Sequence, residues 1–506
     1  MNSEASIAAA VAAYRRGDLR HARQLAEEQL AKSVEAPRLC HLMGMIEGSA
    51  GQSDKALAWL KRAAEAAPAD VGIRIAYARL LADMGWVNEA LAEMDEGSRL
   101  ALERVLANNG QGATAISSAN LQDLRELGLL LERSNQLDGL GQLLTATEKA
   151  GIKKETLGSL WASVALREGR PEEAKRFLLQ DHAYFDDSHW DRLMTKVADA
   201  LGDVDGAFAA AGAMNRAAAG YDEWRRRGAH YRSQIRATAQ IVTPEWALRI
   251  PTAEPSDGIS DPAFVVGFPR SGTTLLDTFL MGHPKTCVVE EGRMLELATG
   301  VISEAIGIDW PADLVMRARQ VYLDELSRHV PPSFWGLVVD KHPMNMLRLA
   351  VLHALFPKSK VIFAQRHPCD VVLSGYMQSF RLNHAMASFL DLADAADLYD
   401  ASMTMWTRSR EAVPQPVHTV VYERLVADPG AELRPAVEFL GLNWSDDLLD
   451  HQTTAKSRGL ITTASFDQVV EPLNSAPSGR WRRYRKHLEP VLPVLLPWAE
   501  RLGYTD

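Results

Sequence analysis

The 506-residue sequence predicts two architectures in one chain, an all-helical repeat solenoid followed by an α/β domain built on a parallel sheet. In the first half, small residues recur at an interval of 34, which is a period of stacked helix pairs. In the second half, short apolar runs alternate with helical segments, as in a parallel sheet covered by helices. A stretch rich in turn residues separates the halves. We therefore expect domains at residues 1–250 and 263–506, with a linker at residues 251–262.

Composition narrows the class of protein. Hydrophobic residues make up 47% of the chain and charged residues 24%, which is ordinary for a soluble globular protein. The net charge of −10 gives no electrostatic reason to bind nucleic acid or an anionic membrane. Three widely spaced cysteines form neither a disulfide framework nor a zinc pattern. With no apolar run of about 18 residues, we expect no membrane-spanning helix and a cytoplasmic protein.

The repeat pattern is clearest before residue 100. Three glycines lie 34 residues apart, and each is followed five residues later by an alanine. These residues are Gly17, Gly51 and Gly85, with Ala22, Ala56 and Ala90. The pattern resembles tetratricopeptide repeats, in which the glycine ends one helix and the alanine lets the next helix pack closely. It returns at Asn135, Gly169 and Gly202, which predicts six helix pairs with an insertion near residues 108–112. A nonrepeating helical bundle is the alternative.

The second half is organised around residues 264–274, which read FVVGFPRSGTT. An apolar run with the composition of a buried strand ends in a loop bounded by Gly267 and Gly272, after which a helical pattern begins. Such a P-loop-like turn binds anions, because unpaired N–H groups at the helix N-terminus point at the ligand. The cation is Arg270, and Thr273 stands where nucleotide kinases have lysine. The loop therefore favours a phosphorylated donor other than a magnesium-bound nucleoside triphosphate.

Further candidates follow later strand-like runs, where the carboxyl ends of parallel strands form ligand sites. They are Glu291, Lys341 and Arg366, which come after the runs at 287–289, 337–339 and 360–364. Ser374 lies eight residues after Arg366, inside a predicted helix. An arginine offers a rigid two-donor fork for phosphate, and a serine hydroxyl adds a third donor. Asp340, which directly precedes Lys341, could instead be the magnesium-binding acid of a P-loop kinase.

In this order, the motifs resemble those of the sulfotransferases that use PAPS (3′-phosphoadenosine 5′-phosphosulfate). PRSGTT is similar to the tyrosylprotein sulfotransferase branch. The resemblance covers roughly the last 245 residues of the chain. It implies that the loop holds the 5′-phosphosulfate through Arg270, which also acts in catalysis, and through Ser271, Gly272, Thr273 and Thr274. It also implies that Arg366 and Ser374 hold the 3′-phosphate.

The same resemblance assigns the chemical roles. Glu291 lies in EEGR, which is similar to the E-E-T-R segment of the tyrosylprotein branch, with Gly292 in place of threonine. Glu291 is thereby implied to remove the acceptor proton. His342 is the rival base, because cytosolic sulfotransferases use a histidine near this place. Lys341 and Ser465 are implied to stabilise charge on the bridging oxygen.

The remaining implied contacts lie towards the C-terminus and beside the glutamates. Those with the donor are Tyr422, Val469 and Arg480, and those with the acceptor are Arg293 and His342. The segment SFDQV at residues 465–469 is similar to S-T-D-Q-V of the branch, with Phe466 in place of threonine. The basic segment at residues 479–486 is also typical of a nucleic-acid contact. The acidic chain and the resemblance favour a donor contact instead.

We therefore expect a metal-free enzyme that moves the sulfuryl group of PAPS to an acceptor hydroxyl and releases adenosine 3′,5′-bisphosphate. The acceptor stays open among a peptide tyrosine, a sugar, a lipid head group and a small phenol, and the resemblance favours tyrosine. The concave face of the repeats is suited to hold a protein or peptide acceptor, or to form a homo-oligomer. The alternatives are an interaction scaffold with an inactive transferase domain, and a P-loop kinase.

Overall fold

The structure is a computed structural model that describes residues 3–31, 36–50, 52–84, 86–109, 118–181, 187–253, 260–303, 310–457, 473 and 478–505. Apart from a segment at residues 458–466 that lies outside this part, the chain divides into two compact units. The first unit comprises residues 1–185, and the second begins at residue 186. Each unit is described by itself.

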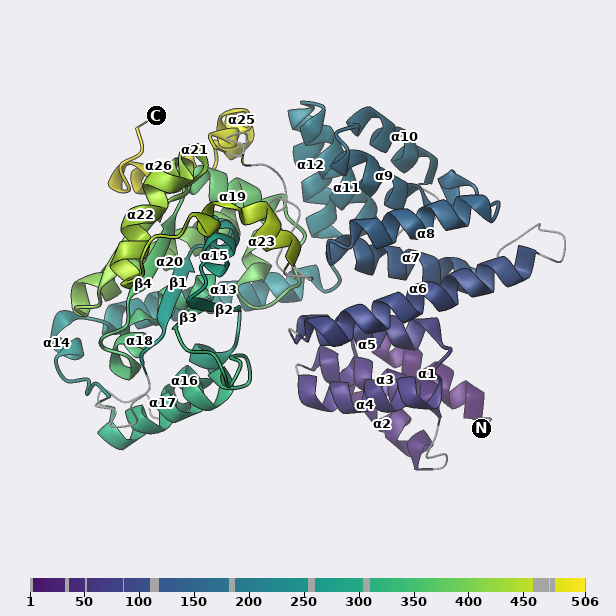
Figure 1. The fold of residues 1–506 in the computed structure, drawn as a ribbon, viewed down its shortest axis with the longest axis horizontal. Coiled ribbons are helices and arrows are strands. Elements are labelled where there is room, and N and C mark those ends of the chain that lie inside the picture. Colours follow the sequence, from purple (N-terminus) through teal and green to yellow (C-terminus); the bar gives the residue numbers. More distant parts are fainter. Residues whose placement is uncertain are drawn as a thin grey trace. The chain divides into compact units, whose positions relative to one another are not determined.

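The first unit is an array of helix pairs (Figure 1). Its helices are α1 Ser3–Arg15, α2 Leu19–Leu30, α3 Pro37–Ser49, α4 Ser53–Ala66, α5 Val71–Asp83, α6 Val87–Asn109, α7 Ser118–Arg133, α8 Leu137–Lys149, α9 Gly158–Arg167 and α10 Pro171–Asp181. The predicted alanines Ala22, Ala56 and Ala90 are buried on the second helix of successive pairs. Gly44 lies so close to α4 that a Cβ there would be 2.5 Å from Leu60 Cγ. The predicted helical repeat array is thereby confirmed.

The turns between paired helices show why the repeat needs special residues. Gly17, Gly169 and Gly202 have φ angles of 79°, 71° and 77°, in the left-handed region that glycine adopts without strain. Asn135 takes the same role with a φ of 57°. Gly51 and Gly85 lie outside the described residues.

The predicted sixth helix pair belongs to the second unit. It consists of α11 Asp187–Ala200 and α12 Val204–Arg216, and it is followed by the long helix α13 Tyr221–Ile241 and the short helix α14 Pro244–Ala247. The division between the two compact units comes at residue 185, before these helices, whereas we predicted a linker at residues 251–262.

Five parallel strands form the sheet of the second unit, in the order β2-β3-β1-β4-β5 (Figure 1). They are β1 Ala263–Gly267, β2 Thr286–Glu290, β3 Leu337–Lys341, β4 Val361–Gln365 and β5 Val417–Val421. The chain moves from β1 to one side through β2 and β3, and then to the other side through β4 and β5. The loop after β1 therefore lies at the point where strand order reverses, which is where such sheets bind ligands.

Helices connect and cover these strands. Each apolar run that we predicted as a strand in this domain forms a strand in the structure. The helices of this part are α15 Thr273–Met281, α16 Met294–Ser303, α17 Ala312–Leu326, α18 Leu349–Leu355, α19 Pro368–Tyr376, α20 Leu392–Ala412, α21 Tyr422–Ala427, α22 Pro429–Leu440, α23 His451–Ser457, α25 Arg485–Leu488 and α26 Leu492–Arg501. The predicted parallel α/β architecture is thus confirmed. Within the described part of the chain, no helix has both the length and the apolar character that crossing a membrane requires.

Charged side chains fasten α13 to α20. The guanidinium of Arg232, whose side chain is 6% exposed, lies 2.8 Å from Asp394 and 2.6 Å from Asp397. Arg225 pairs with Asp394, and Arg236 pairs with Asp397. The apolar side of α13 contributes to the same core as the sheet. These contacts explain why helices before the predicted linker are part of the α/β unit.

Candidate active site

The loop between β1 and α15 is a tight turn that leads directly into the first turn of the helix. Ser271 donates to the carbonyl oxygen of Phe268 through its Oγ at 2.6 Å and through its N–H at 3.1 Å. Arg270 has a φ of 72°, which is uncommon for a residue with a side chain. Gly272 has a φ of 91°, and a Cβ there would be 2.4 Å from the ring of Tyr422. The predicted loop therefore requires glycine at residue 272 for two reasons.

Four predicted donor-binding residues meet at this loop. Arg270 Nε donates to Ser374 Oγ at 3.1 Å, and Arg366 Nη1 donates to the carbonyl oxygen of Arg270 at 2.9 Å. The guanidinium of Arg366 stacks 4.4 Å from the ring centroid of Tyr422. All of these except Tyr422 are buried, as are Thr273 and Thr274 at the start of α15. Residues far apart in the sequence thus form one cluster of guanidinium, hydroxyl and backbone N–H donors.

A buried lysine forms the second part of the site. Lys341, at the end of β3, is fully buried, and its Nζ lies 2.9 Å from Glu290, 3.1 Å from Glu291 and 3.2 Å from Asp277. Burial alone would lower the pKa of Lys341, but Glu290, Glu291 and Asp277 together raise it well above its usual value. Lys341 is therefore a permanent cation at neutral pH.

The two adjacent glutamates are placed differently. Glu290 ends β2 opposite Lys341 in the register of the two strands, and its side chain is 17% exposed. Glu291 has a φ of 50°, donates its N–H to the carbonyl oxygen of Lys341 at 2.7 Å, and has a side chain that is 46% exposed. The left-handed backbone turns Glu291 away from the strand direction. Of the pair, Glu291 is thus the carboxylate that an acceptor could reach.

His342, the rival base, and Asp340, the possible magnesium ligand, both lie in buried surroundings that change their pKa. Burial lowers the pKa of His342 to about 4, so its imidazole is neutral at neutral pH. Asp340 is fully buried, accepts a hydrogen bond of 2.9 Å from the hydroxyl of Tyr322, and has a pKa that burial raises to about 7. A carboxyl group enclosed in this way is not presented to a ligand at the loop, which counts against the kinase interpretation.

The other predicted contacts either pair with residues outside the donor cluster or lie outside the described residues. Arg480 pairs with Asp199 of α11 at 3.1 Å. Arg293 is exposed just before α16 and pairs with Glu296 of that helix at 3.2 Å. Ser465 and Val469 lie outside the described residues.

Sequence reasoning missed Asp277 and the role of Glu290. Asp277 lies on α15, four residues after Thr273, so one face of this helix carries both residues. That helical spacing was the signal that could have placed Asp277 near the loop. The pairing of Glu290 with Lys341 depends on the register between β2 and β3, which no local pattern gives.

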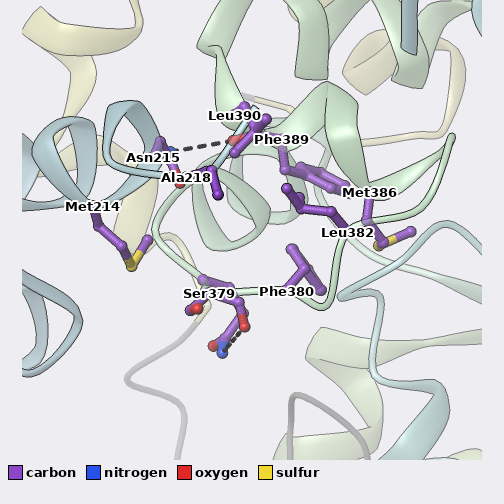
Figure 2. Close-up of a pocket in the computed structure, with 11 residues that line it drawn as sticks. Met214, Asn215, Ala218, Ser379, Phe380, Leu382, Met386, Phe389 and Leu390 are labelled. Carbon is purple, nitrogen blue, oxygen red and sulfur yellow. Dashed lines mark hydrogen bonds between the residues drawn. The ribbon is translucent and has the colours of Figure 1, made fainter. Parts of the chain in front are cut away.

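A pocket lies beside the donor cluster. It has a volume of about 260 Å³ and is lined by the end of α12 and by residues 378–390 (Figure 2). Figure 2 shows Met214 and Ala218 on one side and Phe380, Met386 and Phe389 on the other. The ring of Phe389 also packs edge-on against Phe268 of the loop, with centroids 5.9 Å apart. The ring of Phe389 therefore contacts both the pocket and Phe268 of the anion-binding turn.

Several known proteins are similar to parts of this chain. Residues 262–446 match the sulfotransferase family. Protein-tyrosine sulfotransferase 1 of Danio rerio is 28% identical over 262 residues, which cover 48% of this chain and 71% of that protein. An uncharacterized protein of Aquifex aeolicus (strain VF5) is 29% identical over 295 residues, which cover 55% of this chain but only 37% of the Aquifex protein. The sulfotransferase domain from the curacin biosynthetic pathway is 22% identical, with a TM-score of 0.35, over 49% of this chain and 99% of that domain.

Proposed function

We propose that this protein transfers the sulfuryl group of PAPS to an acceptor hydroxyl. The observation that carries the proposal is the meeting of Arg270, Arg366 and Ser374 at one loop, through the two hydrogen bonds described above. The match of residues 262–446 to the sulfotransferase family supports it.

The donor cluster fits a ligand with two anionic ends. Guanidinium groups, hydroxyls and backbone N–H groups are all hydrogen-bond donors that bind phosphate and sulfate. Arg270, Thr273 and Thr274 would hold the 5′-phosphosulfate, and Arg366 and Ser374 the 3′-phosphate. When bound, PAPS supplies a sulfuryl group activated by its link to the 5′-phosphate. The donor set requires no metal, because cationic side chains neutralise the anionic groups.

Glu291 and Lys341 supply the acid–base and electrostatic parts of the reaction. Glu291 accepts the proton of the acceptor hydroxyl while the acceptor oxygen bonds to sulfur. As the bond between sulfur and the bridging oxygen breaks, Lys341 stabilises the negative charge on that oxygen. We propose that Ser465 assists Lys341. His342 offers no advantage as the base, because a group with a pKa of about 4 holds a proton no better than a carboxylate does.

For the acceptor we propose a phenolic hydroxyl, with a peptide tyrosine as the natural form. The similarity to a protein-tyrosine sulfotransferase supports this choice. So does the pocket beside the loop, because its lining is mostly methionine, leucine and phenylalanine. A dry apolar cavity of about 150 Å³ already holds benzene, so a pocket of about 260 Å³ is large enough for a phenol ring.

Donor binding is tested by thermal shift. Adenosine 3′,5′-bisphosphate should raise the melting temperature, by linkage equivalent to about 2.7 kcal/mol at a hundredfold excess over its Kd. Arg366→Ala should reduce this response, and Arg226→Ala, an exposed arginine on α13, is the matched control. A larger response to ATP with magnesium than to the bisphosphate would contradict the proposal.

Transfer itself is tested with labelled sulfate from PAPS and a panel of a tyrosine peptide, a small phenol, a sugar and a lipid. Glu291→Gln should lower kcat by about 10²-fold or more while the response to bisphosphate stays intact. His342→Ala should have a much smaller effect. The reverse order of the two variants would move the role of base to His342.

A further inference from the structure

We propose that Asp277 is a positioning residue that anchors the Lys341 ammonium from the buried side and frees Glu291 to act as base. The kinetic part of this inference rests on the proposed function. The anchoring part does not, because it concerns an ion pair that stability measurements detect without any turnover.

Lys341 has three carboxylate partners: its Nζ donates hydrogen bonds to Glu290 and Glu291 and forms an ion pair with Asp277. Glu290 and Glu291 come from the end of β2, and Asp277 comes from α15, which follows the anion loop. Asp277 Oδ2 lies 3.2 Å from Lys341 Nζ, and both side chains are fully buried. The hydroxyl of Thr278 lies 3.3 Å from the other oxygen of Asp277. The pair therefore joins α15 to the sheet at the edge where the candidate site lies.

The exposure of the three carboxylates separates their roles. Asp277 is 0% exposed, Glu290 is 17% exposed and Glu291 is 46% exposed. For Lys341 to stabilise a donor oxygen, one of its N–H groups must leave a carboxylate. Glu291 is the partner that has room to move, whereas Asp277 is enclosed. Asp277, together with Glu290, would thus keep the ammonium charged and oriented during this exchange, since a buried lysine without a counter-charge loses its proton.

A double-mutant cycle in the full chain tests the anchor. Lys341→Met and Asp277→Asn should each lower the melting temperature. Lys341→Met leaves the Asp277 carboxylate buried without its cation, so adding Asp277→Asn to that variant should raise the melting temperature again. Asp324→Asn, which removes an exposed carboxylate on α17, is the control and should give no such coupling. Additive effects of Lys341→Met and Asp277→Asn would overturn the proposal.

The split between kcat and KM then separates positioning from a structural role. Asp277→Asn should lower kcat about tenfold or more, because the ammonium is no longer held in place, and should leave KM for PAPS and the bisphosphate response nearly unchanged. Coupled stability with an unchanged kcat would reduce Asp277 to a structural counter-ion and overturn its positioning role. Failure of transfer to every acceptor would refute the proposed function, while the melting-temperature cycle would still decide the anchor.

Discussion

The helix pairs before residue 185 and the helices α11–α13 after it continue one repeat pattern, yet different forces hold them. In the first unit, small residues let apolar side chains interlock, as Gly44 and Leu60 do. In the second unit, α13 is fastened to the α/β core by arginines, and Asp199 of α11 pairs with Arg480. The comparison teaches that a repeat period predicts which helices form but not which unit they join, because the apolar and ionic contacts that α11–α13 make with the α/β core lie outside the repeat pattern.

Truncation tests most directly whether α11–α13 belong to the second unit, and it should have the largest effect. A chain that begins at residue 186 should fold and bind adenosine 3′,5′-bisphosphate, since it keeps the whole second unit. A chain that begins at residue 251 loses α13, which exposes the apolar residues that α13 covers and leaves Asp394 and Asp397 without Arg232. This shorter chain should be insoluble or lack a cooperative melting transition. Circular dichroism melts compare the two fragments, and equal stability would show that α13 is dispensable.

The Arg232 network gives the next largest effect. Arg232→Ala removes a buried guanidinium from two aspartates and from Ser388, so it should destabilise the protein by about 2–4 kcal/mol. The estimate is kept low because Asp397 is 43% exposed and water can solvate it. Urea unfolding measures the loss. Arg227→Ala on the same helix, whose partner Glu223 is exposed, should change little, and equal losses for the two variants would contradict the role of the network.

The smallest of the three effects is expected from overpacking the core of the first unit. Gly44→Ala places a methyl group 2.5 Å from Leu60, so it should cost about 1–3 kcal/mol of stability in the first unit. Gly141→Ala, within α8, meets no atom within 4 Å and should stabilise by up to about 1 kcal/mol. Neither variant should change the response to bisphosphate. A changed response would mean that packing in the first unit affects donor binding in the second.

The sequence predicted the sheet well because its strands are short β-branched runs between glycine-rich or polar turns. The loop was equally clear, since Gly272 and Arg270 serve a local turn and a helix start. The partners of Lys341 were only partly predicted, because Asp277 reaches it through helical phase and Glu290 through strand register. The apolar run at residues 346–355 has a helical pattern, yet its first residues belong to a 3₁₀ turn at Pro343–Arg348 that precedes α18. Proline at the start of this segment favours the tighter turn.

The hydrogen bond from Arg366 to the backbone of Arg270 has a consequence for how the protein would distinguish related nucleotides. It connects the residue proposed for the 3′-phosphate to the loop proposed for the sulfuryl end. A nucleotide that engages Arg366 would therefore also help to hold the loop in its left-handed turn. Adenosine 5′-phosphosulfate has no 3′-phosphate. It would therefore lack the contacts of that phosphate with Arg366 and would not stabilise the loop through Arg366. Discrimination against it should then appear in kcat as well as in KM, because the reacting end would be less well ordered.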